Sequence, residues 1–178
     1  MSHTAIMLIA ALALLIGVIA YDLRSYDPQV QDKPLVTLSF SADGPQRYRV
    51  NLLEGGEGAD TLVSRGGSDR FYGEDGNDLL AAGPAGCTLS GGLGDDTLTG
   101  GTGADTVVDS GGSDVIDLGA GNDSYTATGD SASTGDSVRG GDGNDRITTG
   151  AGNDTVNGGA GRDILATGDG ADSVAGGA

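Results

Sequence analysis

Aspartate recurs at a fixed nine-residue spacing over most of this chain, and such a series of carboxylates points to cation chemistry. The aspartates in the series are Asp60, Asp69, Asp78, Asp96, Asp105, Asp114, Asp123, Asp136, Asp145, Asp154, Asp163 and Asp172. Calcium takes about six to eight hard oxygen ligands, whereas magnesium demands a tighter octahedron and keeps its water. We therefore predict that these aspartates are metal ligands and that the chain binds Ca²⁺ at multiple sites.

The aspartates belong to glycine-rich units of nine residues that begin at Gly55. Good units read GGEGADTLV from Gly55, GGLGDDTLT from Gly91 and GGDGNDRIT from Gly140. Aspartate holds the sixth position in twelve of thirteen units, and residues 127–139 form one unit with four inserted residues. The eighth position is apolar or aromatic in every unit: Leu62, Phe71, Leu80, Leu89, Leu98, Val107, Ile116, Tyr125, Val138, Ile147, Val156, Leu165 and Val174. We expect a three-residue strand over positions seven to nine, with the eighth side chain pointing inward.

The pattern GGxGxDxUx resembles the nonapeptide repeat of RTX proteins, and the resemblance extends from Gly55 to the C-terminus. It implies an all-β fold, a parallel β-roll in which two nonapeptides make one turn of the solenoid. Stacked turns would lie about 4.8 Å apart. Each calcium ion would then bind aspartates of units i and i+2 together with backbone carbonyls. Glycine suits the turns because it tolerates positive φ and lets the backbone approach an ion closely.

One unit has Cys87 where the sixth-position aspartate belongs. Thiols are soft ligands and poor partners for a hard cation such as calcium. We interpret Cys87 as a small apolar substitution that leaves its site weak or empty, with a redox-active or dimerising thiol as the alternative.

The composition argues against several classes of protein. A formal net charge of −17 disfavours nucleic acid, whose phosphates would be repelled. High charge with few aromatic residues is also typical of disorder. The recurrent aspartate at the sixth position and apolar or aromatic residue at the eighth argue against disorder in the cation-loaded state. For catalysis there is one histidine, His3, and no GxSxG or HExxH motif. We expect no enzyme activity, no catalytic residue and no cofactor other than calcium.

An uncharged apolar segment covers residues 5–20. As a helix, at about 1.5 Å per residue, it is shorter than a ~30 Å hydrocarbon core. The flanking Thr4 and Tyr21, with Arg24 snorkelling, extend it towards the length of a transmembrane helix. We predict that residues 1–24 are a membrane anchor or a cleaved signal peptide, with a buried core helix as a third alternative. Residues 25–34, polar and punctuated by proline, are predicted to be a linker.

Residues 35–54 contain two alternating apolar stretches separated by Asp43-Gly44-Pro45. Such a pattern indicates a hairpin or two short strands. A repeat stack needs its first unit covered, so we predict a β cap over residues 35–54 and the β-roll over residues 55–178. A peptide-binding strand pair is the alternative.

These features predict a membrane-anchored calcium-binding β-roll with a structural or accessory-subunit role, which folds on Ca²⁺ outside the cytoplasm. The expected location is the bacterial inner membrane, crossed once by residues 4–21, with the repeats in the periplasm and an integral membrane protein complex as a partner. An exported surface, adhesion or matrix protein with a cleaved signal peptide is the alternative, and a simple calcium buffer is a third interpretation.

Overall fold

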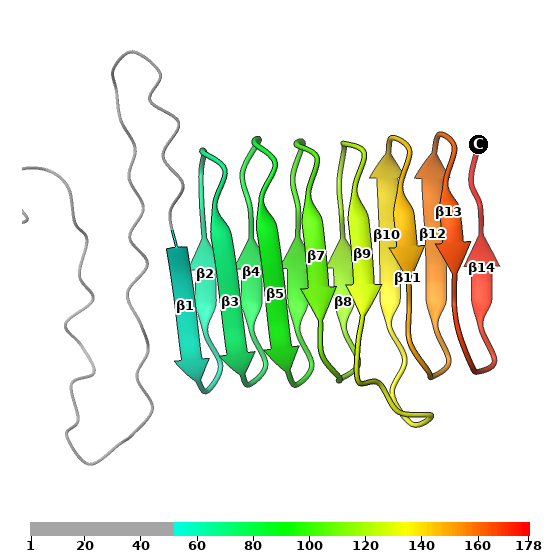
Figure 1. The fold of residues 1–178 in the computed structure, drawn as a ribbon, viewed down its shortest axis with the longest axis horizontal. Coiled ribbons are helices and arrows are strands. Elements are labelled where there is room, and N and C mark those ends of the chain that lie inside the picture. Colours follow the sequence, from blue (N-terminus) through cyan, green and yellow to red (C-terminus); the bar gives the residue numbers. More distant parts are fainter. Residues whose placement is uncertain (1–51) are drawn as a thin grey trace, which may run out of the picture.

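The computed structural model describes residues 52–178, which form a parallel β-roll of two seven-stranded sheets (Figure 1). One sheet has the order β1 (Leu52–Glu57), β3 (Arg70–Asp75), β5 (Thr88–Leu93), β7 (Thr106–Asp109), β9 (Ser124–Ala127), β11 (Arg146–Thr148) and β13 (Ile164–Ala166). The other has the order β2 (Thr61–Val63), β4 (Leu79–Ala81), β6 (Thr97–Thr99), β8 (Val115–Asp117), β10 (Ser137–Asp142), β12 (Thr155–Ala160) and β14 (Ser173–Ala175). Successive strands alternate between the sheets, so two units make one turn, as the resemblance implied.

The register of the sheets follows the repeat. All strand pairs are parallel, and Leu53 pairs with Phe71, which in turn pairs with Leu89. Between β8 and β10, on either side of the longer unit, the sequence separation of paired residues increases by the four inserted residues, and Ile116 pairs with Val138. The inserted residues leave the stack at the lower edge in Figure 1, between β9 and β10. The roll therefore accommodates the four inserted residues, which the sequence had identified, in a loop without losing strand pairing.

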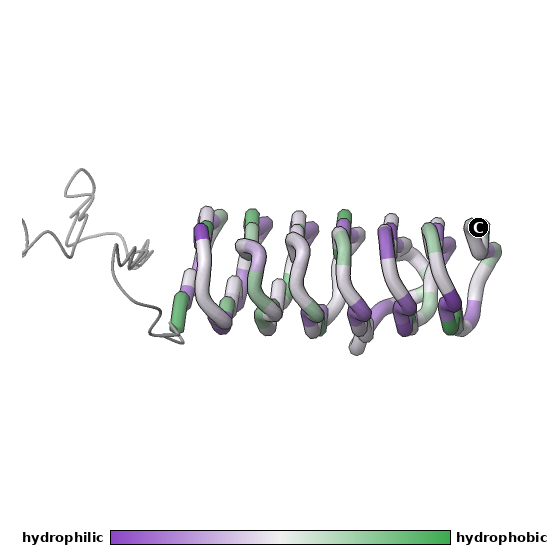
Figure 2. Tube along the Cα trace, turned by 90° about the horizontal axis from the view of Figure 1, so that it is seen from above, coloured by the Kyte–Doolittle hydropathy of each residue, from purple (hydrophilic) through white to green (hydrophobic). Residues whose placement is uncertain are grey.

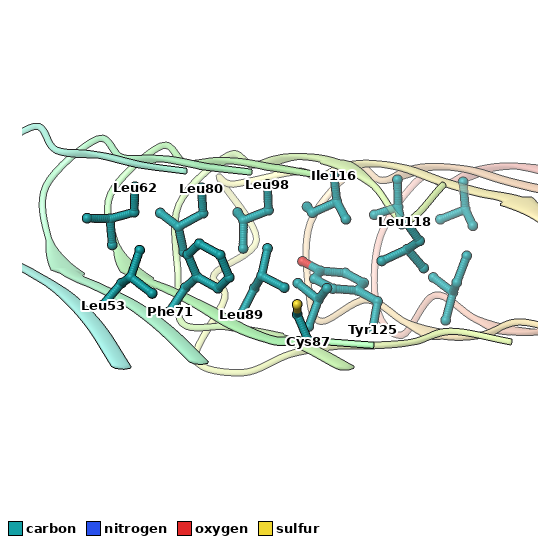
Figure 3. Packing of buried hydrophobic residues seen from close by; sticks show 14 residues of the cluster. Leu53, Leu62, Phe71, Leu80, Cys87, Leu89, Leu98, Ile116, Leu118 and Tyr125 are labelled. Atoms are coloured by element: carbon teal, nitrogen blue, oxygen red, sulfur yellow. The ribbon is translucent and has the colours of Figure 1, made fainter. Parts of the chain in front are cut away.

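The core is a narrow seam between the two sheets. Side chains at the eighth position point into it, and Leu80, Leu89 and Ile147 are completely buried. Figure 3 shows Leu62, Leu80, Leu98 and Ile116 on one side of the seam, and Leu53, Phe71, Leu89 and Tyr125 on the other. Full burial of such side chains contributes roughly 1.5–3 kcal/mol each. The exceptions are at the C-terminal end, where Leu165 is partly buried and Val174 is 50% exposed.

Several strands are longer than predicted. Strands β1, β3, β5, β10 and β12 have six residues and continue from positions seven to nine through the first three positions of the next unit. Residues in these extensions pair with the next turn, for example Gly56 with Glu74. The first position therefore faces inward like the eighth, because alternate side chains of a strand point to the same face. Figure 2 shows the turns stacked along one axis, with hydrophilic and hydrophobic residues interleaved.

Predictions for the N-terminal part fall mostly outside the described residues. The predicted anchor, the linker and most of the β cap lie within residues 1–51. Among residues 52–178 there is no helix with the length and apolar character to cross a membrane. Leu53, which we had placed in the cap, lies in β1 and is buried in the core of the roll.

Candidate metal sites in two rows of aspartates

Each predicted aspartate ligand lies directly before a strand, and together they form two rows along the roll. The first row precedes the even-numbered strands and contains Asp60, Asp78, Asp96, Asp114, Asp136, Asp154 and Asp172. The second row precedes β3 to β13 and contains Asp69, Cys87, Asp105, Asp123, Asp145 and Asp163. Ten of the twelve aspartates are buried, and only Asp163 and Asp172, near the C-terminal end, are partly exposed. The fold thus brings each aspartate beside its counterpart in the next turn.

A ladder of hydrogen bonds orients these carboxylates. The backbone N–H of Asp60 donates to Oδ1 of Asp78 (2.8 Å), and that of Asp78 donates to Oδ1 of Asp96 (2.7 Å). The same bond joins every later neighbour in the first row. It also runs along the second row from Cys87 onward. From Asp78 onward in the first row, and from Asp105 onward in the second, one oxygen of each carboxylate is therefore fixed by the adjacent turn.

In nine of the twelve predicted aspartate ligands, the other oxygen, Oδ2, is buried without a hydrogen-bond partner. The aspartates with such an Oδ2 are Asp60, Asp78, Asp96, Asp105, Asp114, Asp123, Asp145, Asp154 and Asp163. No basic side chain is buried beside them, because every arginine in residues 52–178 is exposed and that range contains no lysine or histidine. An ionised carboxylate buried without a partner costs several kcal/mol. With these aspartates ionised, the roll needs cations from solution.

Burial raises the pKa of many of these carboxyl groups. For Asp96 it raises the pKa to about 7, with the charges of Asp78 and Asp114 adding to the effect. The pKa of Asp105 is also raised to about 7, again mainly by burial. Burial raises the pKa values of four further members, Asp60, Asp78, Asp123 and Asp145. A proton or a metal cation is therefore favoured at these positions near neutral pH.

The space around Oδ2 suits a hard divalent cation. A Cβ atom added at Gly55 would lie 2.9 Å from Oδ2 of Asp60 and 2.7 Å from the carbonyl oxygen of Gly73 in the next turn. At Gly100 the corresponding distances are 2.7 Å to Oδ2 of Asp105 and 2.5 Å to the carbonyl oxygen of Leu118. First-position glycine therefore leaves a gap bordered by carboxylate and carbonyl oxygens. These are the ligands that calcium takes in proteins.

Two predicted ligands have protein donors on Oδ2 instead. The hydroxyl of Ser64 donates to Asp69, and the hydroxyl of Tyr125 donates to Asp136 at 2.7 Å. Burial raises the pKa of Asp136 to about 6, although the hydrogen bond from Tyr125 acts in the opposite direction. A carboxylate oxygen that accepts one hydrogen bond keeps a second lone pair, so these hydroxyls occupy only part of the binding capacity of each Oδ2. The part of Asp69, Asp136 and the other ten predicted aspartates in metal binding stays a prediction.

Cys87 takes the place of an aspartate in the second row. Its sulfur accepts a long hydrogen bond from the backbone N–H of Asp69 (3.4 Å), and its own N–H donates to Oδ1 of Asp105 (2.7 Å). The side chain is buried in the core cluster, and burial raises the pKa of its thiol. A buried, protonated thiol supports the interpretation as a small apolar substitution that interrupts the row of carboxylates.

Sequence reasoning missed Asp109, although the signal was present. Asp109 stands at a first position, where glycine is commonest, and it is completely buried. One carboxylate oxygen from each of Asp96, Asp109 and Asp114 lies within 4.8 Å of the other two. Burial, together with the nearby Asp114 carboxylate, raises the pKa of Asp109 to about 9. The signal was an acidic residue at a first position, which faces inward. It gives the first row an additional carboxylate beside Asp96 and Asp114.

The insertion also contributes a carboxylate, Asp130, which the sequence did not single out. Both of its carboxylate oxygens are buried without a hydrogen-bond partner. Burial raises its pKa, and the charges of Asp114 and Asp154 in the first row raise it further. The inserted loop therefore adds negative charge to the same edge of the roll.

A second ladder, at the fifth position, runs along the outside of the turns. Oδ1 of Asn77 accepts from the backbone N–H of Asp95 (3.0 Å), and Oδ1 of Asp95 accepts from that of Ser113 (2.9 Å). Asn144 and Asn153 make the same bond to the next turn. These side chains are exposed and join the turns without needing a cation. In the sequence, the frequent Asn or Asp at the fifth position was the signal for this second ladder.

Comparison with known proteins identifies the repeat. The family model for the RTX calcium-binding nonapeptide repeat matches four times, at residues 49–83, 90–125, 132–165 and 148–178. No curated protein and no solved structure matches the chain. The matched segments cover most of the sequence, and the buried aspartates fit the multiple Ca²⁺ sites of such repeats. The chain belongs to the RTX calcium-binding nonapeptide-repeat family, and its parallel β-roll binds calcium.

Proposed function

We propose that the protein is a membrane-tethered calcium-binding β-roll that folds on Ca²⁺ outside the cytoplasm and has a structural or accessory role rather than a catalytic one. The observation that carries the proposal is the series of buried Oδ2 atoms without hydrogen-bond partners. Because these carboxylates repel one another, calcium binding and folding are coupled. The family is generally structural, which supports a role other than catalysis.

The location follows from the calcium supply. Calcium sites of extracellular modules have dissociation constants of about 10⁻⁴–10⁻³ M. Cytosolic calcium is too scarce to fill sites of that kind, so a roll that folds on calcium needs a compartment rich in this ion. The apolar residues 5–20 supply either an anchor or an export signal. The periplasm, with the chain held in the inner membrane, satisfies both conditions.

Protease accessibility tests the location. The full chain, tagged at its C-terminus and expressed in a bacterium, should lose the tag when protease is added to intact spheroplasts, while a cytosolic marker stays protected. Protection of the tag until lysis would place the repeats inside and contradict the proposal. Intact mass of the recovered chain separates a retained anchor, which keeps residues 1–24, from a cleaved signal peptide.

The accessory role has its own test. After mild detergent extraction, an accessory subunit should migrate on a native gel with a large membrane complex, and that migration should survive a moderate rise in salt. A chain that migrates at its own mass supports an independent surface or structural protein instead. The calcium-binding roll is common to both readings, so this gel decides only the role.

A further inference from the structure

Asp109 is buried at a first position, where glycine is the commonest residue of the repeat. It ends β7, and the residues at the same position in the neighbouring strands of its sheet are Gly91 of β5 and Ala127 of β9. Its Oδ1 accepts a hydrogen bond from the backbone N–H of Gly92 (3.0 Å), which holds the carboxylate across the turn. A Cβ atom at Gly91 would collide with the oxygens of both Asp96 and Asp109. Glycine at that position therefore makes the room in which the two carboxylates meet.

Ser64 shows what a hydroxyl at the first position can do there. Its hydroxyl donates a hydrogen bond to Oδ2 of Asp69, the sixth-position carboxylate of the same unit. Asp109 has the same relation to Asp114 in its own unit, five residues further on. An ionised carboxylate, unlike a hydroxyl, can only accept hydrogen bonds. Replacing the hydroxyl with a carboxylate thus removes the donor and adds a charge.

The three carboxylates have no protein partner that neutralises them. Oδ2 of Asp96, Asp109 and Asp114 is buried without a hydrogen-bond partner in each case. All three side chains are at most 1% exposed, with Asp109 at 0%. The arginines of residues 52–178 are all exposed, so none of them neutralises the group. A cation with several oxygen ligands satisfies all three at once.

We propose that Asp109 is a calcium ligand outside the nonapeptide consensus, and that with Asp96 and Asp114 it forms a three-carboxylate site that binds calcium more tightly than the other sites of the roll. The inference rests on calcium binding by the roll. Calcium affinity in proteins is tuned by the number of charged ligands and by the rigidity of the site. Here a third carboxylate is added, and the hydrogen bond from Gly92 fixes it in place. This site would fill first as calcium rises.

Calorimetric titration of the full chain with Ca²⁺ tests the proposal through two variants. Asp109→Asn keeps an oxygen for the Gly92 N–H but removes the charge, and Asp109→Gly restores the residue typical of the position. The matched control is Asp142→Asn, which removes one charge from an exposed side chain. The wild type and the control should show one site that is tighter than the rest. Both Asp109 variants should weaken it by at least about tenfold, because even partners outside the ligand shell contribute about 10–100-fold.

Terbium gives an independent readout of the position of this site. Tb³⁺ prefers oxygen ligands like Ca²⁺ and carries a third charge, so a three-carboxylate site should take the first equivalent. Tyr125 lies close enough for the charges of Asp109 and Asp114 to act on its hydroxyl, and excited tyrosine transfers energy to nearby terbium. The first equivalent of Tb³⁺ should give sensitised emission that is lost in Tyr125→Phe and reduced in Asp109→Asn.

The outcomes separate this inference from the proposed function. A wild type that binds no calcium would contradict both. Calcium binding with the same affinities in the wild type and in Asp109→Asn would overturn the three-carboxylate site alone. First-equivalent terbium emission that is unchanged in Asp109→Asn would also overturn it, since the tightest site would then lie elsewhere.

Discussion

The backbone N–H of Asp78 donates a 2.7 Å hydrogen bond to Oδ1 of Asp96, eighteen residues further along the chain. This bond fixes the carboxylate between two turns of the roll and leaves Oδ2 buried without a partner. The same carboxylate is thus a structural acceptor through one oxygen and a candidate calcium ligand through the other. This division of labour between the two oxygens allows the two roles to be tested separately.

Asp96→Asn should keep the first role and lose the second. The amide oxygen can still accept from the Asp78 N–H, but the charged oxygen is gone, so the sites on both sides of Asp96 should weaken and up to two calcium ions should be lost. Asp95→Asn is the matched control, because it removes the same charge from the neighbouring, exposed residue and keeps the fifth-position ladder. Calcium should be counted by native mass spectrometry. Equal counts in the two variants would show that Asp96 is not a ligand.

Cys87→Asp should repair the second row. The new carboxylate would lie between Asp69 and Asp105, where the sulfur now accepts from the Asp69 N–H. We expect up to two more bound calcium ions, counted in the same way, and a higher melting temperature in calcium. Cys87→Ala, which removes the thiol without adding oxygen, should gain no ion. A Cys87→Asp protein with the wild-type count would mean that the substitution is not what limits this site.

Two leucines provide a test of the core seam. Leu98 is 1% exposed at an eighth position, whereas Leu79 is 41% exposed at a seventh position on the outer face. Leu98→Ala should lower the free energy of unfolding of the calcium-loaded protein by about 2–5 kcal/mol. Leu79→Ala should change it by about 0.5 kcal/mol or less. Denaturant unfolding at saturating calcium measures both. Similar losses in the two variants would contradict the assigned inward face.

The pH dependence without calcium should be opposite to that of most proteins. Burial raises the pKa of Asp96 and Asp105 from 3.8 to about 7, and that of Asp109 to about 9. A carboxyl group with a raised pKa in the folded state stabilises the fold below its unfolded pKa. That stability is lost as pH rises through the folded value. In chelator, the β signal in circular dichroism should therefore be larger near pH 4 than near pH 8.

Calcium should reverse this trend, because the ion competes with protons for the same oxygens. At saturating calcium the roll should stay folded near pH 8, and the calcium needed for half-maximal folding should rise as the pH falls. A calcium-free protein with more β structure at pH 8 than at pH 4 would contradict the burial of ionisable carboxyl groups in the folded roll.

Much of the fold could be predicted because two positions of the repeat constrain it independently. The sixth-position aspartates and the eighth-position apolar residues both recur every nine residues, and a parallel roll stacks both sets at once. The insertion in residues 127–139 was also predictable, since Asp136 resumes the pattern after it. The register change between β8 and β10 follows directly from its four residues.

Other features depend on relations that the repeat does not encode. The inward direction of the first position became visible only when the strands extended past position nine. It places the carboxylate of Asp109 close to those of Asp96 and Asp114. The hydrogen bond from Tyr125 to Asp136 joins an eighth-position residue of one sheet to a sixth-position residue before the other. Such a bond needs a side chain long enough to cross the seam, and a leucine at position 125 would fit the repeat equally well.

Folding on calcium is the central claim, and circular dichroism of the full chain tests it most directly. The protein should be kept in mild detergent because of the apolar residues 5–20. In chelator at pH 8 it should show little β signal, and millimolar Ca²⁺ should produce the β-roll reversibly, whereas the same concentration of Mg²⁺ should not replace it. A chain that is fully folded in chelator, with a stability unchanged by calcium, would contradict the account.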